Sequence, residues 1–235
     1  MVKLMTTDEQ KRAAARAALD YVKPGMKLGL GTGSTAKHFI DLVGQKVKEG
    51  LDVVCVPTSE TTRKQAASLH IPLTTLEQHS FLDLTVDGAD EFDGDFNVMK
   101  GGGGALLAEK IVASSSRHMV VIADKSKQVK SLGAFPLPVE VVPFGVKATA
   151  WKIERAFKIL DLTAKMVLRR KDGKPFVTDG GHAIIDCALG HIPDPPRLAA
   201  ILSGIPGVVD HGLFIGICGI ILMAGDDGVK TFRKT

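Results

Sequence analysis

Hydrophobic residues follow two different spacings in the first half of the chain. Short, nearly continuous apolar runs are typical of buried strands, and they occupy residues 26–30, 51–56, 82–86 and 118–123. Between these runs, apolar residues recur every three or four positions, which predicts helices following Thr35 and over residues 60–69 and 105–114. Strands that alternate with helices indicate a doubly wound, Rossmann-like sheet that is mostly parallel.

A further helix is predicted before the first strand. Residues Thr7-Asp8-Glu9-Gln10 have the form of a capping box, in which a hydroxyl residue is followed three positions later by Glu or Gln. Pro24-Gly25 predicts the end of this segment, because neither residue favours a helix interior.

The order of elements changes after Pro136. The pattern predicts strands and helices in the order β-α-β-β-α-β, at residues 137–142, 147–160, 164–170, 183–187, 195–203 and 208–214. Asp172-Gly173 predicts a hairpin turn whose partner strand begins at either Phe176 or Ala183. The β-α-β-β-α-β order is that of a split ferredoxin-like unit. We therefore predict an α/β protein with a Rossmann-like domain, residues 1–135 plus 215–235, and a smaller inserted α+β domain, residues 136–214.

Composition excludes several classes of protein. The net charge is only +4 and no basic run is present, which argues against a nucleic-acid partner. The sequence shows neither a signal peptide nor an apolar run long enough to cross a bilayer, so no membrane association is expected. The three cysteines are scattered and form no CxxC pair, which favours reduced, buried thiols and a cytoplasmic location.

A glycine-rich turn, Gly29 to Thr35, joins the first predicted strand to a helix. The exposed N–H groups of such a turn and the helix N-terminus favour a phosphate, and Thr32, Ser34 and Thr35 add hydroxyl donors. The turn is neither a P-loop nor a complete GxGxxG motif. We favour an anion-binding loop over a purely structural turn, because ligands bind at the carboxyl ends of parallel strands.

An acidic segment, residues 87–95, follows the strand at 82–86. We expect Asp87 and Asp90 to be functional, because clustered carboxylates at a strand end repel one another unless a ligand or a proton is present. Residues 91–95 are instead interpreted as a solvated turn. A calcium loop does not fit, since Val98 occupies the position of the required glycine and Gly104 that of the closing acid.

Four consecutive glycines, Gly101 to Gly104, follow Lys100 and precede an apolar helix. Such a run is entropically costly and is justified where the backbone approaches a ligand closely. Glu109 lies among apolar residues of that helix. It is either a proton shuttle, because an apolar environment raises a carboxyl pKa, or a surface residue beside Lys110. The sequence offers no zinc motif, HExxH or GxSxG, so neither a metal nor a cofactor is expected.

Together these motifs resemble the type A ribose-5-phosphate isomerase family. The resemblance extends over nearly the whole chain, and DGADE followed by KGGGGA is its most specific part. The matching blocks are GLGTGSTA (29–36), DGADE (87–91), KGGGGAL (100–106), Glu109-Lys110, Ala123-Asp124, SKQV (126–129), FPLPVEVV (135–142), IPGVVDHGLF (205–214) and Asp227-Gly228-Val229.

The resemblance implies a cofactor-free isomerase that acts on ribose 5-phosphate and ribulose 5-phosphate in the pentose phosphate pathway, as a homodimer or a dimer of dimers. It implies that Glu109 is the proton acceptor and that Asp87, Asp90 and Lys100 are the other catalytic residues. Residues expected to bind the sugar phosphate are Thr32, Gly33, Ser34, Thr35, Gly88, Ala89, Gly101, Gly102, Gly103 and Lys127. The sequence departs from the family pattern at Ala108, where arginine is common, and at Cys218-Gly219, where a more polar pair is common.

Two other classes of function remain open from the sequence. Sugar-phosphate-sensing domains of transcriptional regulators resemble this fold, although only about one helix precedes the first strand here, too little for a helix-turn-helix. A sugar-phosphate deaminase or an acyl-group transferase that uses a coenzyme A thioester is the other alternative, and the DGADE and KGGGGA blocks argue against both.

Overall fold

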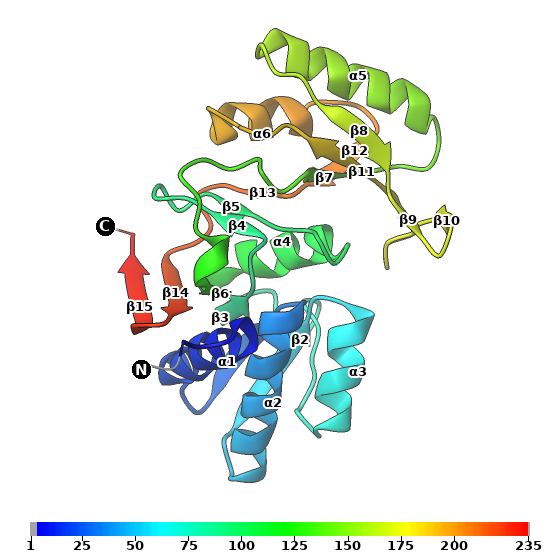
Figure 1. Cartoon of the computed structure of the whole chain (residues 1–235). Coiled ribbons are helices and arrows are strands. Elements are labelled where there is room, and N and C mark those ends of the chain that lie inside the picture. Colours follow the sequence, from blue (N-terminus) through cyan, green and yellow to red (C-terminus); the bar gives the residue numbers. More distant parts are fainter. Residues whose placement is uncertain (1–3, 235) are drawn as a thin grey trace. The chain divides into compact units, whose positions relative to one another are not determined.

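The computed structural model describes residues 4–234, which form two compact units (Figure 1). The first unit contains residues up to 89, 108–128 and those from 216 onward, and the second contains 90–107 and 129–215. Each unit is described by itself. The helix α4 (Leu106–Ser114) begins in the second unit and continues into the first.

A six-stranded sheet forms the centre of the first unit, with the strand order β15-β14-β6-β3-β1-β2. The strands are β1 (Met26–Leu30), β2 (Val53–Pro57), β3 (Leu82–Asp87), β6 (Ser116–Asp124), β14 (Ile220–Gly225) and β15 (Gly228–Arg233). All neighbours pair in parallel except β14 and β15, which form an antiparallel hairpin. The predicted parallel sheet and the return of the C-terminal segment to it are therefore confirmed.

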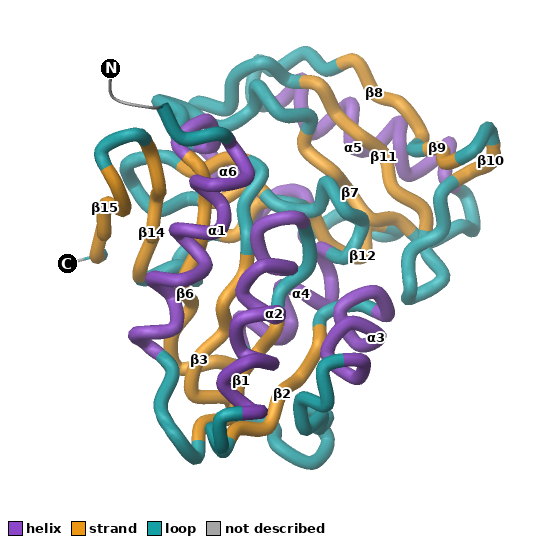
Figure 2. The backbone as a smooth tube through the Cα atoms, turned by 60° about the horizontal axis from the view of Figure 1, so that its bottom comes forward, coloured by secondary structure: helices purple, strands orange, loops and turns teal. Residues whose placement is uncertain are grey.

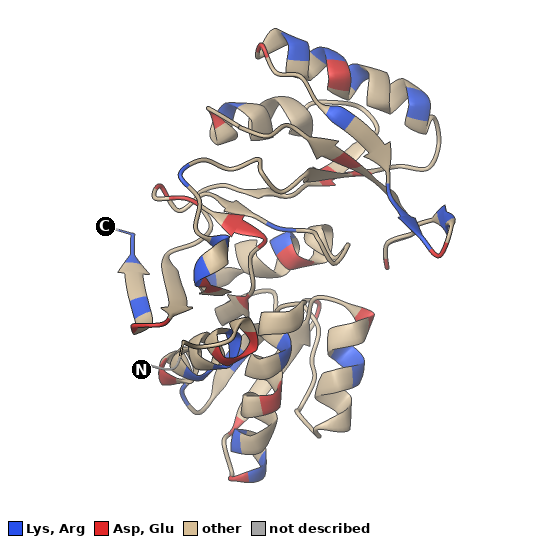
Figure 3. Ribbon diagram, viewed as in Figure 1, with Lys and Arg blue, Asp and Glu red and all other residues tan. Residues whose placement is uncertain are grey.

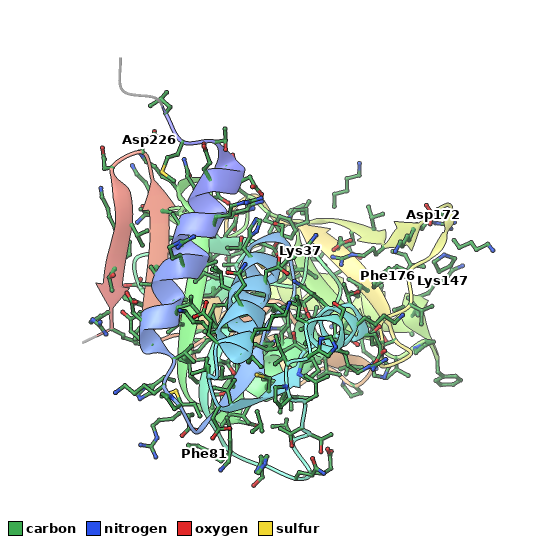
Figure 4. All side chains as sticks on the ribbon, turned by 90° about the horizontal axis from the view of Figure 1, so that it is seen from below. Lys37, Phe81, Lys147, Asp172, Phe176 and Asp226 are labelled. Atoms are coloured by element: carbon green, nitrogen blue, oxygen red, sulfur yellow. The ribbon has the colours of Figure 1, made fainter. Side chains whose placement is uncertain are left out.

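Helices α1 (Thr7–Ala18), α2 (Ser34–Lys48) and α3 (Glu60–Ser68) belong to this unit, and a short 3₁₀ turn, η1 (Leu19–Tyr21), follows α1 (Figure 2). One core cluster joins Ala14 and Ala18 of α1 to Phe39 of α2 and Leu28 of β1, all fully buried. The small side chains of the two alanines let α1 pack closely on the sheet. At the β14–β15 turn, labelled in Figure 4, Asp226 accepts a hydrogen bond from Met5 N–H at 3.0 Å.

The capping box of α1 lies one residue earlier than predicted. Thr6, rather than Thr7, is the N-cap, and its hydroxyl accepts a hydrogen bond from Glu9 N–H at 3.2 Å. The Glu9 carboxylate in turn accepts one from Thr6 N–H at 2.7 Å. Two consecutive threonines make both frames possible, and Glu9 forms the charge-assisted bond that Gln10 cannot form.

A four-stranded antiparallel sheet with the order β12-β7-β11-β8 forms the core of the second unit. Its elements are β7 (Leu137–Val141), α5 (Val146–Ile159), β8 (Lys165–Leu168), β11 (Ala183–Ala188), α6 (Pro195–Ser203) and β12 (Val208–His211). Their order along the chain is the predicted β-α-β-β-α-β, so the ferredoxin-like unit is confirmed. The core cluster brings Val139, Ile153 and Leu198 together from the sheet and both helices.

The predicted hairpin at Asp172-Gly173 is present, but its strands are short. They are β9 (Arg170–Lys171) and β10 (Lys174–Pro175), and both central residues have positive φ, as a type I′ turn requires. The strand that begins at Ala183 pairs instead with β8 and β7.

The division into units differs from the predicted boundaries at 135 and 215. Residues 90–107 belong to the second unit because β4 (Glu91–Phe92) and β5 (Val98–Met99) form a small sheet with β13 (Leu213–Phe214). Residues 129–135 also belong to the second unit, and Val129 N–H donates to the carbonyl of Phe92 at 2.9 Å. Strands this short carry no detectable periodicity in the sequence.

The described part of the chain, residues 4–234, includes no helix that is long and apolar enough to cross a membrane.

The three cysteines are buried, free thiols, and burial raises the pKa of each to about 12. Only about one thiol in ten thousand is then ionised at pH 8, and the thiolate is the reactive form. We expect Cys55, Cys187 and Cys218 not to react with iodoacetamide at pH 8 in the folded protein and to react within minutes in denaturant. Mass spectrometry of the alkylated peptides measures this, and rapid alkylation of the native protein would contradict the burial.

Candidate active site

The glycine-rich turn of the first unit leads directly into α2. Gly33 is the N-cap of that helix, and its φ of 126° is a conformation that L side chains rarely adopt. Gly33 and Ser34 are exposed, Thr32 is partly exposed, and Thr35 is buried. The first turn of α2 contains no acidic residue. Its N–H groups and hydroxyls therefore suit an anion.

Asp87, at the end of β3, holds this turn in place. It is fully buried, and its Oδ1 accepts hydrogen bonds from Thr32 N–H at 3.1 Å and from Gly88 N–H at 2.7 Å. Gly31 packs against it so closely that a Cβ atom there would lie 2.1 Å from Asp87 Oδ1. One carboxylate thus fixes the backbone of two of the predicted substrate-binding segments, 32–35 and 88–89.

A cluster of hydroxyl groups around Thr32 was not predicted. Thr32 Oγ1 lies 2.8 Å from Thr58 Oγ1, 2.8 Å from Ser59 Oγ and 3.1 Å from Thr62 Oγ1. The three partners come from the end of β2 and the start of α3. Thr62 also donates to the carbonyl of Gly31 at 2.9 Å, so the cluster braces the turn from the neighbouring strand.

The first unit also contains two lysines that bear on an anion site, Lys11 and Lys127. Lys11 of α1 donates to Ser34 Oγ at 3.0 Å, which brings a positive charge to the predicted anion-binding turn and was also not predicted. Lys127 ends the 3₁₀ turn η2 (Lys125–Lys127) and is partly exposed. Asp124 caps that turn by accepting from Ser126 N–H at 3.1 Å.

Glu109 lies in α4 and is only 3% exposed, whereas its neighbour Lys110 is partly exposed. Val112 and Ala113, on the same helix, are buried as well. Of the two interpretations that the sequence left open, the buried carboxylate is the observed one. A carboxylate shielded from bulk water is suited to carry a proton between two atoms of one bound molecule.

In the second unit, Lys100 follows β5 and is 3% exposed. Its backbone N–H donates to Gly212 O at 2.8 Å, and its Nζ lies 5.7 Å from the centre of the Phe214 ring. A Cβ atom on Gly212 would lie 2.3 Å from the carbonyl oxygen of Lys100, so this pairing needs a glycine. A buried ammonium group of this kind can stabilise a negative charge that develops on a substrate oxygen.

Asp90 contacts the glycine run directly, since its Oδ2 accepts a hydrogen bond from Gly102 N–H at 2.8 Å. Gly101 and Gly104 both have positive φ, and Gly104 N–H donates to Gly101 O at 3.0 Å, so the run is a tight turn. Gly102 and Gly103 are exposed at its tip. The contact gives Asp90 a definite task in shaping the turn.

The solvated turn predicted for residues 91–95 is limited to Gly94 and Asp95, which are exposed in a turn. Glu91 is 4% exposed and accepts hydrogen bonds from Gly133 N–H at 2.7 Å and Phe135 N–H at 2.6 Å. Asp93 is also buried and accepts from the N–H groups of Asp95 and Asn97, each at 3.0 Å. The prediction was wrong for Glu91 and Asp93 because both carboxylates satisfy backbone N–H donors, those of a distant loop for Glu91 and those of its own turn for Asp93.

The model of the family "Ribose 5-phosphate isomerase A (phosphoriboisomerase A)" matches residues 54–228 of the chain. Ribose-5-phosphate isomerase A of Rhodopseudomonas palustris (strain HaA2) is 59% identical over 231 residues, covering 98% of this chain and 100% of the relative. The protein of the same name from Parvibaculum lavamentivorans is 60% identical over 225 residues, covering 95% and 97%.

This chain belongs to the ribose-5-phosphate isomerase A family. It is an isomerase that interconverts ribose 5-phosphate and ribulose 5-phosphate. The resemblance seen in the sequence motifs is confirmed by these matches.

Solved structures agree with this family assignment in their fold. A D-ribose-5-phosphate isomerase in complex with phospho-erythronic acid has a TM-score of 0.92 and 38% identity, covering 98% of this chain and 100% of the other. Ribose 5-phosphate isomerase from Plasmodium falciparum has a TM-score of 0.91 and 39% identity, covering 97% and 99%.

The two departures from the family pattern lie on different elements of the structure. Ala108, partly exposed, directly precedes Glu109 in α4, and Cys218 is buried two residues before β14. Within residues 4–234 of this isomerase, no three His, Cys, Asp or Glu side chains are grouped so that they could hold a metal ion.

Proposed function

We propose that this isomerase moves a proton between C2 and C1 of its substrate through an enediolate, with Glu109 as the proton acceptor. In the direction of ketose formation, Glu109 takes the proton from C2 and returns it to C1. The O2 hydroxyl proton moves to O1, so that an aldehyde with a neighbouring alcohol becomes a ketone with a neighbouring alcohol. The 3% exposure of Glu109 is the observation that supports this role most strongly, because bulk water does not compete for the proton.

Lys100 and the glycine amides are proposed to stabilise the negative oxygen of the enediolate. Lys100 is buried, its backbone N–H is bonded to Gly212 O, and its ammonium group lies over the Phe214 ring, so it needs little reorganisation when charge develops. Asp87 and Asp90 are proposed to assist ring opening and the transfer of hydroxyl protons. Each also has a positioning task, Asp87 for the 32–35 turn and Asp90 for Gly102.

The phosphate of the substrate is proposed to bind at the N-terminus of α2, with Lys11 and Lys127 contributing positive charge. The exposed Gly33 and Ser34, the hydroxyl cluster behind Thr32, and the 3.0 Å contact of Lys11 with Ser34 support this placement. A related solved structure contains phospho-erythronic acid, which is a ligand of the same chemical class. Binding energy from this remote group would help to position the reacting carbons.

Two further properties are proposed from the family and the thiols. The resemblance to the family leads us to expect a homodimer or a dimer of dimers, which sedimentation would measure. Three free, buried cysteines fit a reducing, cytoplasmic environment.

The proposed proton transfer is tested by incubating the chelator-treated protein with ribose 5-phosphate in D₂O. We expect ribulose 5-phosphate to form and a fraction of it to carry solvent deuterium at C1, because part of the protons taken up by Glu109 exchange with solvent before they return to the substrate. Nuclear magnetic resonance of the product measures both. Ketose without any solvent deuterium would indicate a shielded proton or a hydride shift, and binding without ketose would indicate a sugar-phosphate sensor instead.

A further inference from the structure

Arg169 joins the glycine turn to the sheet of the second unit. It lies between β8 and β9, and its Nη1 donates to Gly101 O at 2.8 Å and to Gly102 O at 3.2 Å. All three residues belong to the same compact unit. The guanidinium group therefore binds the carbonyl side of the same turn whose N–H side is bound by Asp90.

The guanidinium group is itself held firmly. Asp186 of β11 accepts two hydrogen bonds from it in a bidentate arrangement, with Nε lying 2.9 Å from Oδ2. The two side chains are 14% and 26% exposed, so solvent screens the ion pair only partly. The Arg169 backbone is fixed as well, because its N–H donates to Ile184 O at 2.8 Å.

Phe176 adds an apolar contact to the same arrangement (labelled in Figure 4). Its ring centre lies 5.8 Å from the guanidinium carbon of Arg169, and its N–H donates to Arg169 O at 2.9 Å. A Cβ atom on Gly104 would lie 2.4 Å from the end of that ring. The last glycine of the run is thus required by Phe176, a residue far away in the sequence.

Binding a carbonyl oxygen with a cation changes the N–H of the same peptide group. Electron density is drawn toward the oxygen, and the N–H on the other side of the bond becomes a stronger donor. The carbonyl of Gly102 shares its peptide group with the N–H of Gly103. Gly103 is exposed, and its N–H donates to no acceptor within residues 4–234.

We propose that Arg169, oriented by Asp186, is a positioning residue for the isomerase reaction. It holds the glycine turn in shape and strengthens the Gly103 N–H as a donor to an anionic oxygen of the substrate. The proposal rests on the proton-transfer mechanism given above. It assigns a task to two residues that lie outside every motif of the sequence analysis.

The test compares variants of Arg169 with a matched control on the next residue. Arg170 is exposed in β9, one of the basic strands in Figure 3, and donates to Gly173 O at 2.9 Å within its own hairpin. We expect Arg169→Ala to lower kcat by about tenfold to a hundredfold, less than loss of a direct oxyanion donor, with KM nearly unchanged. Arg170→Ala is expected to retain normal kcat and KM.

Chemical rescue separates positioning from a merely structural role. Guanidinium ion should restore the kcat of Arg169→Ala in a saturable manner, at concentrations too low to unfold the protein. Urea at the same concentration should not restore it. Asp186→Asn should lower kcat less than Arg169→Ala does. A kcat within about twofold of the starting protein, or a loss that guanidinium does not restore in a folded variant, overturns the proposal.

Arg169→Lys covers the case in which the alanine variant fails to fold. Lysine keeps the charge but cannot bind Asp186 in a bidentate manner and both carbonyls at once, so kcat should fall about tenfold. An unchanged kcat of this variant overturns the proposal. Failure of the mechanism itself is distinguishable, because Glu109→Gln would then retain near-normal turnover.

Discussion

Replacing Glu109 with Gln is expected to reduce turnover by roughly 10²-fold or more, because the amide cannot accept the C2 proton. Glutamine has nearly the same shape as glutamate, so it should fit the buried position of Glu109 and the fold should be retained. Binding of the sugar phosphate should persist, since the proposed phosphate site uses other residues. Turnover is measured by ketose formation, and binding by titration calorimetry with a non-reacting phosphorylated sugar acid.

The matched control is Glu49→Gln, which removes an exposed carboxylate at the end of α2. Glu49 forms a surface ion pair with Lys46 at 2.6 Å, and exposed ion pairs contribute little to stability. This variant should retain normal turnover. Near-normal turnover of Glu109→Gln would move the proton acceptor elsewhere, and Asp87 would be the first residue to substitute next.

Replacing Gly31 with Ala is expected to damage both stability and turnover. The added Cβ atom would lie 2.1 Å from Asp87 Oδ1 and 2.6 Å from Asp87 Cα. Rotation of the Asp87 side chain cannot relieve the second clash, so the backbone must move. Overpacking of this kind typically costs about 1–3 kcal/mol of unfolding free energy. A displaced Asp87 and 32–35 turn should lower kcat/KM by about a hundredfold.

Gly219→Ala provides the control for this effect in the same unit. A Cβ atom there has no other atom within 4 Å, and the residue does not have positive φ. Thermal unfolding and steady-state kinetics of the two variants measure the difference. Equal melting temperatures and equal kcat/KM would show that Asp87 is not held as tightly as its contacts with Gly31 and Thr32 indicate.

The sequence predicted the parts of the candidate site that are built from residues adjacent in the sequence. The turn at 29–35 and the glycine run at 101–104 are contiguous, and their glycines mark where the backbone takes a conformation closed to other residues. Strand and helix periodicities also predicted both sheets; in the first sheet, for example, β6 contains the apolar run Met119 to Ala123.

The remaining contacts join residues that are distant in the sequence. Thr58 and Thr62 reach Thr32 only because β2 lies next to β1 in the sheet. Glu91 resembles a surface carboxylate until Gly133 and Phe135 bring their N–H groups to it. No local pattern encodes such partners, since each depends on the register of strands that the sequence does not specify directly.

The position of β14 also has a consequence for synthesis of the chain. Residues 125–219 separate β6 from β14, which pairs along it in parallel. At the usual rate of translation, roughly 5 to 20 s pass between the emergence of the two strands from the ribosome. During that interval the edge of β6 lies open, with its unpaired N–H and C=O groups available to other nascent chains. The newly made protein should therefore depend on a chaperone more than its size alone suggests.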